Sequence, residues 1–141
     1  MKDYKYFIDS NIFLRPIVKD DLAKVKECER IFEKINKGEI KAFTSNLVLA
    51  ELIWTGKKVY GIEKTELIKV IRGILDLRNL KIVDDFNSRL ALAIYEKYPI
   101  KFIDALIASN PKIYKKEAVV VSYDKDFDKI GIKRKEPSQI I

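Results

Sequence analysis

Short apolar segments alternate with longer helix-like segments along this chain, and that alternation restricts its fold more than any other feature. Runs that predict buried strands occupy residues 4–8, 40–43, 80–83 and 118–121, and a last short strand is expected at 130–134. Segments that predict helices occupy residues 22–35, 47–54, 67–75, 86–97 and 102–108. Strands that alternate with helices indicate an α/β fold with a mainly parallel sheet.

Length and composition fit one globular domain spanning residues 1–141. Hydrophobic residues make up 48% of the chain and charged residues 35%, and no linker or repeat divides it. There is no run of 18 apolar residues, and charges interrupt the first 20 positions, so we expect neither a membrane span nor a signal peptide. We therefore expect a cytoplasmic protein.

Polar residues predict where several of these elements begin and end. The first strand stops at the turn formers Asp9-Ser10-Asn11. Helix caps are expected at Asp20 or Asp21, at Thr44 or Ser45, and at Asp84 or Asp85. Pro111 should end or kink the helix at 102–108. The helix at 47–54 is apolar nearly all round, so we expect it to be buried, with Trp54 in the core.

Four acidic residues stand where apolar residues are expected. Asp9 follows the first strand, Asp124 follows the strand at 118–121, Asp104 lies in the first turn of its helix, and Glu51 interrupts the apolar helix at 47–54. Asp and Glu are almost never fully buried unless they are paired or bind a metal. Ligand crevices of open parallel sheets lie beyond the carboxyl ends of the strands, so we expect these carboxylates to meet there.

Carboxylates gathered in this way repel one another, and a divalent cation would remove the conflict. Two unit charges about 4 Å apart cost about 4 kcal/mol at an effective dielectric constant near 20. Donor sets made of oxygen suit Mg²⁺ or Mn²⁺. The chain has no histidine, which excludes Ser-His-Asp and Cys-His catalysis and imidazole metal sites. Its one cysteine, Cys28, excludes an internal disulfide and a zinc–thiolate cluster.

Each acidic residue also has a simpler interpretation. Asp9 and Asp124 could be turn or cap residues. Asp104 could complement a helix dipole, and Glu51 could pair with a buried Arg or Lys. Taken together, the four are less easily explained in these ways. Two further acids, Asp126 and Asp128, fit a short polar helix, and Asp128 stays open as an additional metal ligand.

Four motifs occur in a fixed order: Phe7-Ile8-Asp9-Ser10-Asn11, then Thr44-Ser45 followed by Glu51, then Phe102-Ile103-Asp104-Ala105-Leu106-Ile107-Ala108, then Val121-Ser122-Tyr123-Asp124 with Asp126-Phe127 behind. With these motifs the sequence resembles the PIN-domain ribonucleases, and most closely the VapC-type toxins of toxin–antitoxin systems. The resemblance covers nearly the whole chain. It implies a PIN-like α/β/α sandwich around a parallel sheet, and metal-dependent cleavage of RNA.

By matching position, the resemblance implies that Asp9, Glu51, Asp104 and Asp124 are catalytic acids that hold Mg²⁺ or Mn²⁺. Asn11 and Ser122 would contact these acids or the metal-bound water. Water activated by one ion, with a second ion stabilising the leaving oxygen, would leave a 5′-phosphate and a 3′-hydroxyl. The resemblance also implies a homodimer, for which the apolar face of residues 67–75 offers a surface, and a possible antitoxin partner.

Basic residues would have to bring RNA to this acidic site. The chain has 28 basic and 21 acidic residues, a net charge of +7, which favours a polyanionic partner. Candidates near the motifs are Arg15, Lys57, Lys58 and Lys101. Trp54 and Tyr60 could stack on bases. Solvated surface lysines and a core Trp54 are the simpler interpretations.

Four functions stay open from the residues. The first is an endoribonuclease toxin held in check by an antitoxin, and the second is a PIN nuclease of RNA processing without one. The third is a non-catalytic RNA-binding module, against which the intact set of acids argues. The fourth is a phosphate-receiver-like signalling domain, against which Glu51 within a helix argues. A short overlapping reading frame upstream would favour the toxin.

Overall fold

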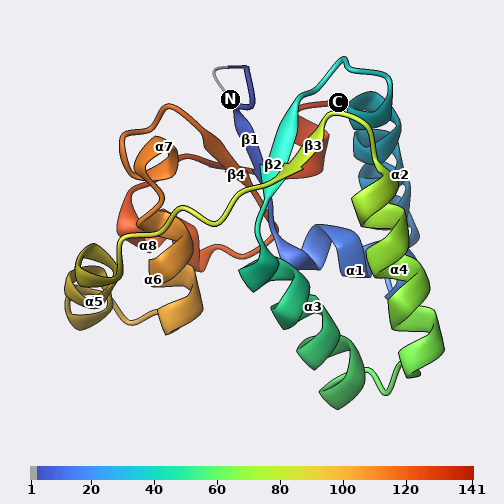
Figure 1. The fold of residues 1–141 in the computed structure, drawn as a ribbon, viewed down its shortest axis with the longest axis horizontal. Coiled ribbons are helices and arrows are strands. Elements are labelled where there is room, and N and C mark those ends of the chain that lie inside the picture. Colours follow the sequence, from blue (N-terminus) through green and yellow to red (C-terminus); the bar gives the residue numbers. More distant parts are fainter. Residues whose placement is uncertain (1–2) are drawn as a thin grey trace.

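The computed structural model describes residues 3–141, in which a five-stranded sheet carries helices on both faces (Figure 1). The strands are β1 (Tyr6–Ile8), β2 (Ala42–Thr44), β3 (Leu80–Ile82), β4 (Val119–Val121) and β5 (Arg134–Lys135). The helices are α1 (Ser10–Val18), α2 (Leu22–Asn36), α3 (Asn46–Lys58), α4 (Lys64–Asp76), α5 (Ser88–Lys97), α6 (Phe102–Ala108), α7 (Pro111–Tyr114) and α8 (Asp126–Ile130), and the 3-10 turn η1 spans Pro137–Gln139. Within the described part of the chain, no helix is long and apolar enough to cross a membrane.

All five strands run parallel, in the order β3-β2-β1-β4-β5. The chain moves outward from β1 to β3 and then returns across the sheet to β4 and β5. Right-handed crossovers therefore place α1 to α4 on one face and α5 to α8 on the other, as Figure 1 shows. The predicted α/β/α architecture is confirmed. The strand order reverses between β1 and β4, which is where open α/β sheets bind their ligands.

Apolar strand residues form the core between the two helical layers. Phe7 of β1 and Phe43 of β2 are fully buried and meet edge to face, with ring centroids 5.3 Å apart. Helix α2 contributes one apolar face to this core, in which Cys28, Ile31 and Ile35 are fully buried, whereas Leu22 at its start is 70% exposed. This packing fixes the end of β1, from which the first of the acidic residues projects.

Helix α1 was not predicted, because the residues after β1 read as a turn. The Asp9 backbone is extended, and its carboxylate accepts a hydrogen bond from the Ser10 amide, so Asp9 is the N-cap of a helix. Turn formers are also the preferred N-caps, and the residues that follow decide between the two. Here Ile12, Phe13 and Leu14 are all buried, which favours the helix.

Several predicted boundaries are confirmed. Asp21 caps α2 and Ser45 caps α3, each through a hydrogen bond from a backbone amide to its side chain. Helix α6 ends at Ala108, and Pro111 begins the separate helix α7, whose first amides donate to the Asn110 side chain. Asp104, in the first turn of α6, is unaffected by this break.

Two predictions at element ends were wrong. The cap of α5 is Asn87, whose Oδ1 accepts from the Leu90 amide at 3.0 Å. Asp84 instead accepts two hydrogen bonds from Asn46, at 2.8 and 2.6 Å, and so holds the start of α3. The strand expected at 130–134 is shorter and begins further along the chain, because residues 126–130 form α8 and only Arg134–Lys135 pair with β4.

Helix α3 is not buried on all sides. Val48 and Leu52 are fully buried, but Ile53 is 39% exposed and Trp54 is 62% exposed. The helix packs against α1 and α4, and this contact leaves another side open to solvent. The prediction that Trp54 belongs to the core was therefore wrong.

Candidate metal centre

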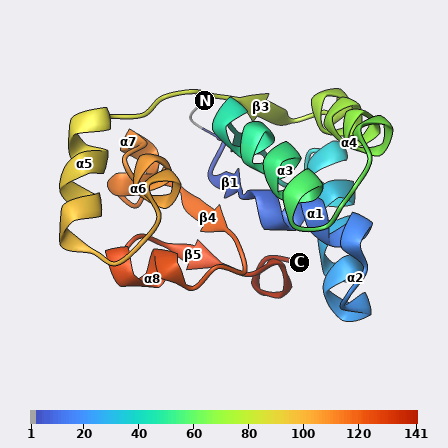
Figure 2. The same cartoon turned by 90° about the horizontal axis from the view of Figure 1, so that it is seen from below.

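The acidic side chains come together at the carboxyl edge of the sheet, which faces the viewer in Figure 2. Asp9 links β1 to α1, Asp124 and Asp126 lie between β4 and the first turn of α8, Asp104 lies in the first turn of α6, and Glu51 is on α3. Negative charges on Asp9, Asp124 and Glu51 all act on Asp104. The structure thus brings the four predicted acids together beside the strand-order reversal.

Hydrogen bonds fix the Asp9 carboxylate in one orientation. Its Oδ1 accepts from the Ser10 amide at 2.8 Å. Its Oδ2 accepts from Ser122 Oγ at 2.7 Å and from Asn11 Nδ2 at 3.3 Å. Asn11 also donates to Ser122 Oγ at 2.9 Å and accepts from the Tyr123 amide at 3.2 Å. Asn11 and Ser122 therefore tie the end of β1 to the end of β4 around Asp9.

Burial makes negative charge costly on the two most enclosed acids. Asp9 is 4% exposed and Asp104 is 2% exposed. Burial raises the pKa of Asp9 to about 6, opposed by the Ser122 hydrogen bond and reinforced by the negative charge of Glu51. Burial also raises the pKa of Asp104 to about 7, opposed by the positive charge of Lys101. A bound cation would favour the charged form of both groups.

One oxygen in this cluster has no partner. Within residues 3–141, Asp104 Oδ2 is the one buried side-chain oxygen or nitrogen that makes no hydrogen bond. One carboxylate oxygen from each of Asp104, Asp124 and Asp126 lies within 4.8 Å of the other two. An unsatisfied buried carboxylate oxygen costs free energy unless a ligand contacts it. The donors are all oxygens, so these residues fit a hard divalent cation such as Mg²⁺ or Mn²⁺.

Asp126 is a member of this cluster that the sequence pattern does not predict. The pattern after β4 predicts the polar surface of a short helix, and α8 does form there, but its first residue meets the other acids. Its amide donates to Asp124 Oδ1 at 2.9 Å, which holds the two carboxylates side by side. The Asp-x-Asp spacing after β4 was the available signal. Asp128, left open as a ligand, instead accepts two hydrogen bonds from Arg134, at 3.0 and 3.1 Å.

Glu51 and Lys101 complete the cluster. Ser10 Oγ donates to Glu51 Oε1 at 2.7 Å, and Lys101 Nζ lies 3.8 Å from Glu51 Oε2. Partial burial works against the positive charge of Lys101, yet the negative charges of Asp104 and Glu51 raise its pKa overall. The simpler interpretation of Glu51, pairing with a buried base, does not hold in that form, because the Lys101 side chain is 60% exposed.

The amino-acid sequence is similar to those of known proteins. The PIN domain family matches residues 6–133. The chain belongs to the PIN domain family. This PIN domain is 30% identical over 142 residues to Ribonuclease VapC2 of Methanocaldococcus jannaschii, a match that covers 92% of the chain and 91% of that protein. It is 28% identical over 131 residues to a VapC ribonuclease of Aquifex aeolicus, covering 92% of the chain and 95% of that protein.

Solved structures have the same PIN fold. VapBC2 from Rickettsia felis, bound to a DNA fragment from its promoter, gives a TM-score of 0.66 at 23% identity, over 93% of this chain and 97% of that one. PAE2754 from Pyrobaculum aerophilum gives a TM-score of 0.69 at 14% identity, over 97% of this chain and 93% of that one. FitAcB from Neisseria gonorrhoeae gives a TM-score of 0.63 at 16% identity, over 96% of this chain and 99% of that one. At these identities the likeness concerns the fold alone.

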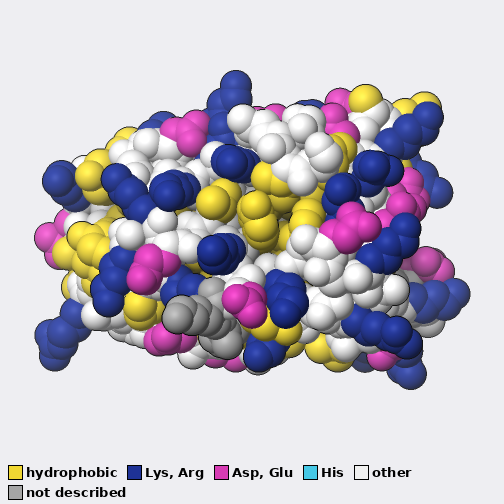
Figure 3. All heavy atoms as spheres, turned by 90° about the horizontal axis from the view of Figure 1, so that it is seen from above, with side chains coloured by type: hydrophobic (Ala, Val, Ile, Leu, Met, Phe, Trp, Pro, Cys, Tyr) yellow, Lys and Arg dark blue, Asp and Glu magenta, His cyan; other side chains and the backbone are white. Residues whose placement is uncertain are grey.

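The basic residues predicted to contact RNA lie at different places on this PIN domain. Lys101 lies at the acidic cluster. Arg15 is one turn beyond Asn11, where it pairs with Asp20 at 2.8 Å and lies over the Tyr123 ring, 5.0 Å from its centroid. Lys and Arg also spread over the face at the amino ends of the strands, mixed with acidic residues around a hydrophobic patch (Figure 3). The positive charge is therefore not confined to the acidic edge.

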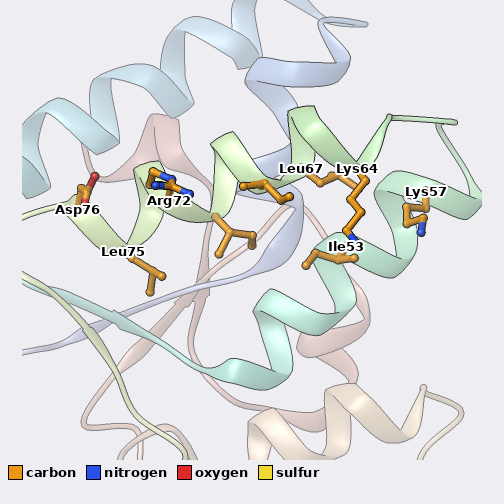
Figure 4. A pocket seen from close by; sticks show the side chains of 9 residues that line it. Ile53, Lys57, Lys64, Leu67, Arg72, Leu75 and Asp76 are labelled. Atoms are coloured by element: carbon orange, nitrogen blue, oxygen red, sulfur yellow. The ribbon is translucent and has the colours of Figure 1, made fainter.

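Of the other two predicted lysines, Lys57 lines a groove between α3 and α4 (Figure 4), and Lys58 follows it in the chain. Lys57 and Lys58 stand in the last turn of α3, about two turns beyond Glu51, and the exposed Tyr60 follows that helix. The groove has a volume of ≈ 510 Å³ and is lined by Ile53, Lys57, Lys64, Leu67, Ile68, Ile71, Arg72, Leu75 and Asp76. Its floor is apolar and its rim is mainly basic, which distinguishes it from the acidic cluster.

Proposed function

We propose that this PIN domain is a Mg²⁺- or Mn²⁺-dependent endoribonuclease that acts in the cytoplasm as the toxin of a toxin–antitoxin pair. The observation that carries the proposal is the acidic cluster at the strand-order reversal, in which buried Asp104 Oδ2 lacks a partner. The ribonuclease names of the M. jannaschii and A. aeolicus relatives support the same function.

Asp104, Asp124 and Asp126 would hold the cation together with Asp9 and Glu51. When bound, it would supply a Lewis acid for a phosphate oxygen and acidify a water molecule. Asp104 must first lose its proton, because burial raises its pKa to about 7.

Neighbouring side chains prepare this site for phosphate. Ser122 and Asn11 hold Asp9, and Ser10 holds Glu51, so the carboxylates do not have to reorganise when substrate arrives. Lys101 places a positive charge where a phosphate would enter. The chain has no histidine, the commonest catalyst for attack by a 2′-hydroxyl, so hydrolysis should leave a 5′-phosphate and a 3′-hydroxyl.

The first prediction concerns cleavage itself. Asp104→Asn should abolish cleavage of end-labelled single-stranded RNA and leave the chain folded, because it removes a metal ligand and a repulsive charge. The wild-type chain should need Mg²⁺ or Mn²⁺ and stop in EDTA. Asp85→Asn removes the same charge from an exposed residue outside the cluster and should cleave at the wild-type rate.

The products are read on denaturing gels after phosphatase treatment. Cleavage by Asp104→Asn at the wild-type rate, cleavage that survives EDTA, or a 2′,3′-cyclic phosphate product would each contradict the proposed chemistry.

We propose two protein partners as well. One is a second copy of the chain on the groove between α3 and α4, where Ile68 is 44% and Leu75 58% exposed. The other is an antitoxin that inserts an Arg into the acidic cluster. A guanidinium pairs with carboxylates in a bidentate geometry and would exclude both metal and phosphate.

A further inference from the structure

A hollow lies directly beside the acidic cluster. It has a volume of ≈ 570 Å³ and is lined by Tyr95, Tyr98, Pro99, Ile100, Lys101 and Asp126. This set, which we call the aromatic hollow, joins the end of α5 to the starts of α6 and α8; α5 and α6 stand side by side in Figures 1 and 2. Lys101 and Asp126 belong to both the hollow and the acidic cluster. A ligand bound at the cluster can therefore extend into the hollow, because the two sites share these side chains.

The rings of the hollow reach solvent, and each contacts a neighbouring side chain. Tyr95 is 46% exposed and meets Phe102, which is 41% exposed, edge to face with centroids 5.5 Å apart and an angle of 89° between the ring planes. Tyr98 is partly buried, and Lys97 Nζ lies 5.4 Å from its ring centroid. A ring ordered by its neighbours can stack on a ligand with little further loss of conformational entropy.

The charges around the hollow favour one kind of occupant. Lys97 and Lys101 stand beside the rings, and the one acidic side chain of the lining, Asp126, belongs to the candidate metal centre. Flat rings next to cations and a phosphate-binding centre match a nucleic acid strand, in which bases alternate with phosphates. A second copy of this chain would be expected on a mainly apolar face, and the groove between α3 and α4 is more apolar than this one.

We propose that the aromatic hollow binds one unpaired base of a single-stranded RNA, next to the phosphate at the acidic cluster. This inference rests on the proposed nuclease function and adds a base-binding site to it. A base enters the hollow only when it is not paired, so duplex RNA should be a poor substrate. Every base has a π-face, so the hollow should bind bases with little sequence preference.

Binding and cleavage of a fluorescein-labelled, single-stranded RNA of 12 nucleotides test the proposal. Tyr95→Ala should weaken binding and raise KM about tenfold, within the roughly 5- to 140-fold that the loss of one base stack produces. Its kcat should change little. Tyr95→Phe keeps the ring and should match the wild type. Tyr114→Ala removes an equally exposed tyrosine, 49% exposed, outside the hollow and should also match the wild type.

RNA with one abasic nucleotide gives the decisive comparison. An abasic site next to the cleaved bond should weaken wild-type binding as much as Tyr95→Ala does, and should have no added effect on the Tyr95→Ala chain. If Tyr95→Ala and Tyr114→Ala show the same KM and the same affinity for RNA, in a chain that cleaves RNA, base binding in the hollow is contradicted. The proposed nuclease function is then unaffected.

Failure of the proposed nuclease function would give a different result. A wild-type chain that binds RNA but does not cleave it would contradict that function, and the binding measurements alone would then test base binding in the hollow. Sedimentation without RNA provides the last check. If Tyr95→Ala dissociates a dimer, the hollow belongs to a contact between two copies, and the base-binding proposal is overturned.

Discussion

The buried carboxylates of Asp9 and Asp104 should make the metal-free chain sensitive to pH. Burial raises their pKa values to about 6 and about 7, above the ordinary value of about 3.9 for an unfolded Asp. Between those values the folded chain binds more protons than the unfolded chain. The free energy of unfolding in EDTA should therefore rise as pH falls from about 8 to 5.

Asp104→Asn tests this sign. In EDTA at pH 8 the substitution should raise the free energy of unfolding by about 1–3 kcal/mol, because it removes a charge that burial disfavours, and it should flatten the pH dependence. Urea denaturation at several pH values measures both effects. Asp85→Asn, on an exposed residue, should leave the slope unchanged. A variant less stable than the wild type at pH 8 would contradict the cost assigned to Asp104.

Among the elements, α3 and α4 carry apolar side chains that the fold itself does not cover. Ile68 and Leu75 stand open on α4, whereas Leu67 on the same helix is 2% exposed and packs against α3 at Gly56. Exposed apolar residues that line one groove indicate a contact with another protein more than a packing role. This division of α4 into a packed and an open side makes the proposed homodimer testable.

Charge placed on the open side should separate the two copies without unfolding either. The double variant Ile68→Glu/Leu75→Glu should shift the chain from dimer to monomer at tens of micromolar in analytical ultracentrifugation, with helix content unchanged. Leu67→Ala should instead lower the free energy of unfolding by about 2–5 kcal/mol, because it opens a cavity in the packed side. A wild-type chain that is monomeric at this concentration would contradict the dimer.

At the scale of the whole molecule, the sequence predicted a parallel sheet and the edge at which the acids lie, because residues that follow parallel strands all lie at one edge. Asp9 and Asp124 are also neighbours along that edge because β1 pairs with β4, and the sequence did not predict this strand order. The sequence did not predict that Asp126 joins them, because that depends on how the first turn of α8 is oriented. It also placed Trp54 in the core, because an apolar helix face reads the same whether its own fold or a partner covers it.

Co-expression tests the proposed role of the whole chain. Expressed alone, the wild-type chain should slow growth of its host, and the product of an adjacent upstream reading frame should restore growth by placing an Arg in the acidic cluster. The Asp104→Asn chain should not slow growth, which separates cleavage from the burden of expression. RNA cleavage in vitro without any effect on growth would favour an RNA-processing nuclease that has no antitoxin.

The hydrogen bond between Ser122 and Asp9 joins residues 113 positions apart. A ribosome completes β1 first, and its partner β4 emerges only after β2, β3 and the helices between them. Pairing over such a separation is slow, because a long loop must close before any contact compensates for the lost entropy. The carboxylates of this PIN domain can therefore come together only after β4 has left the ribosome. The proposed nuclease would have no complete acidic cluster before that point.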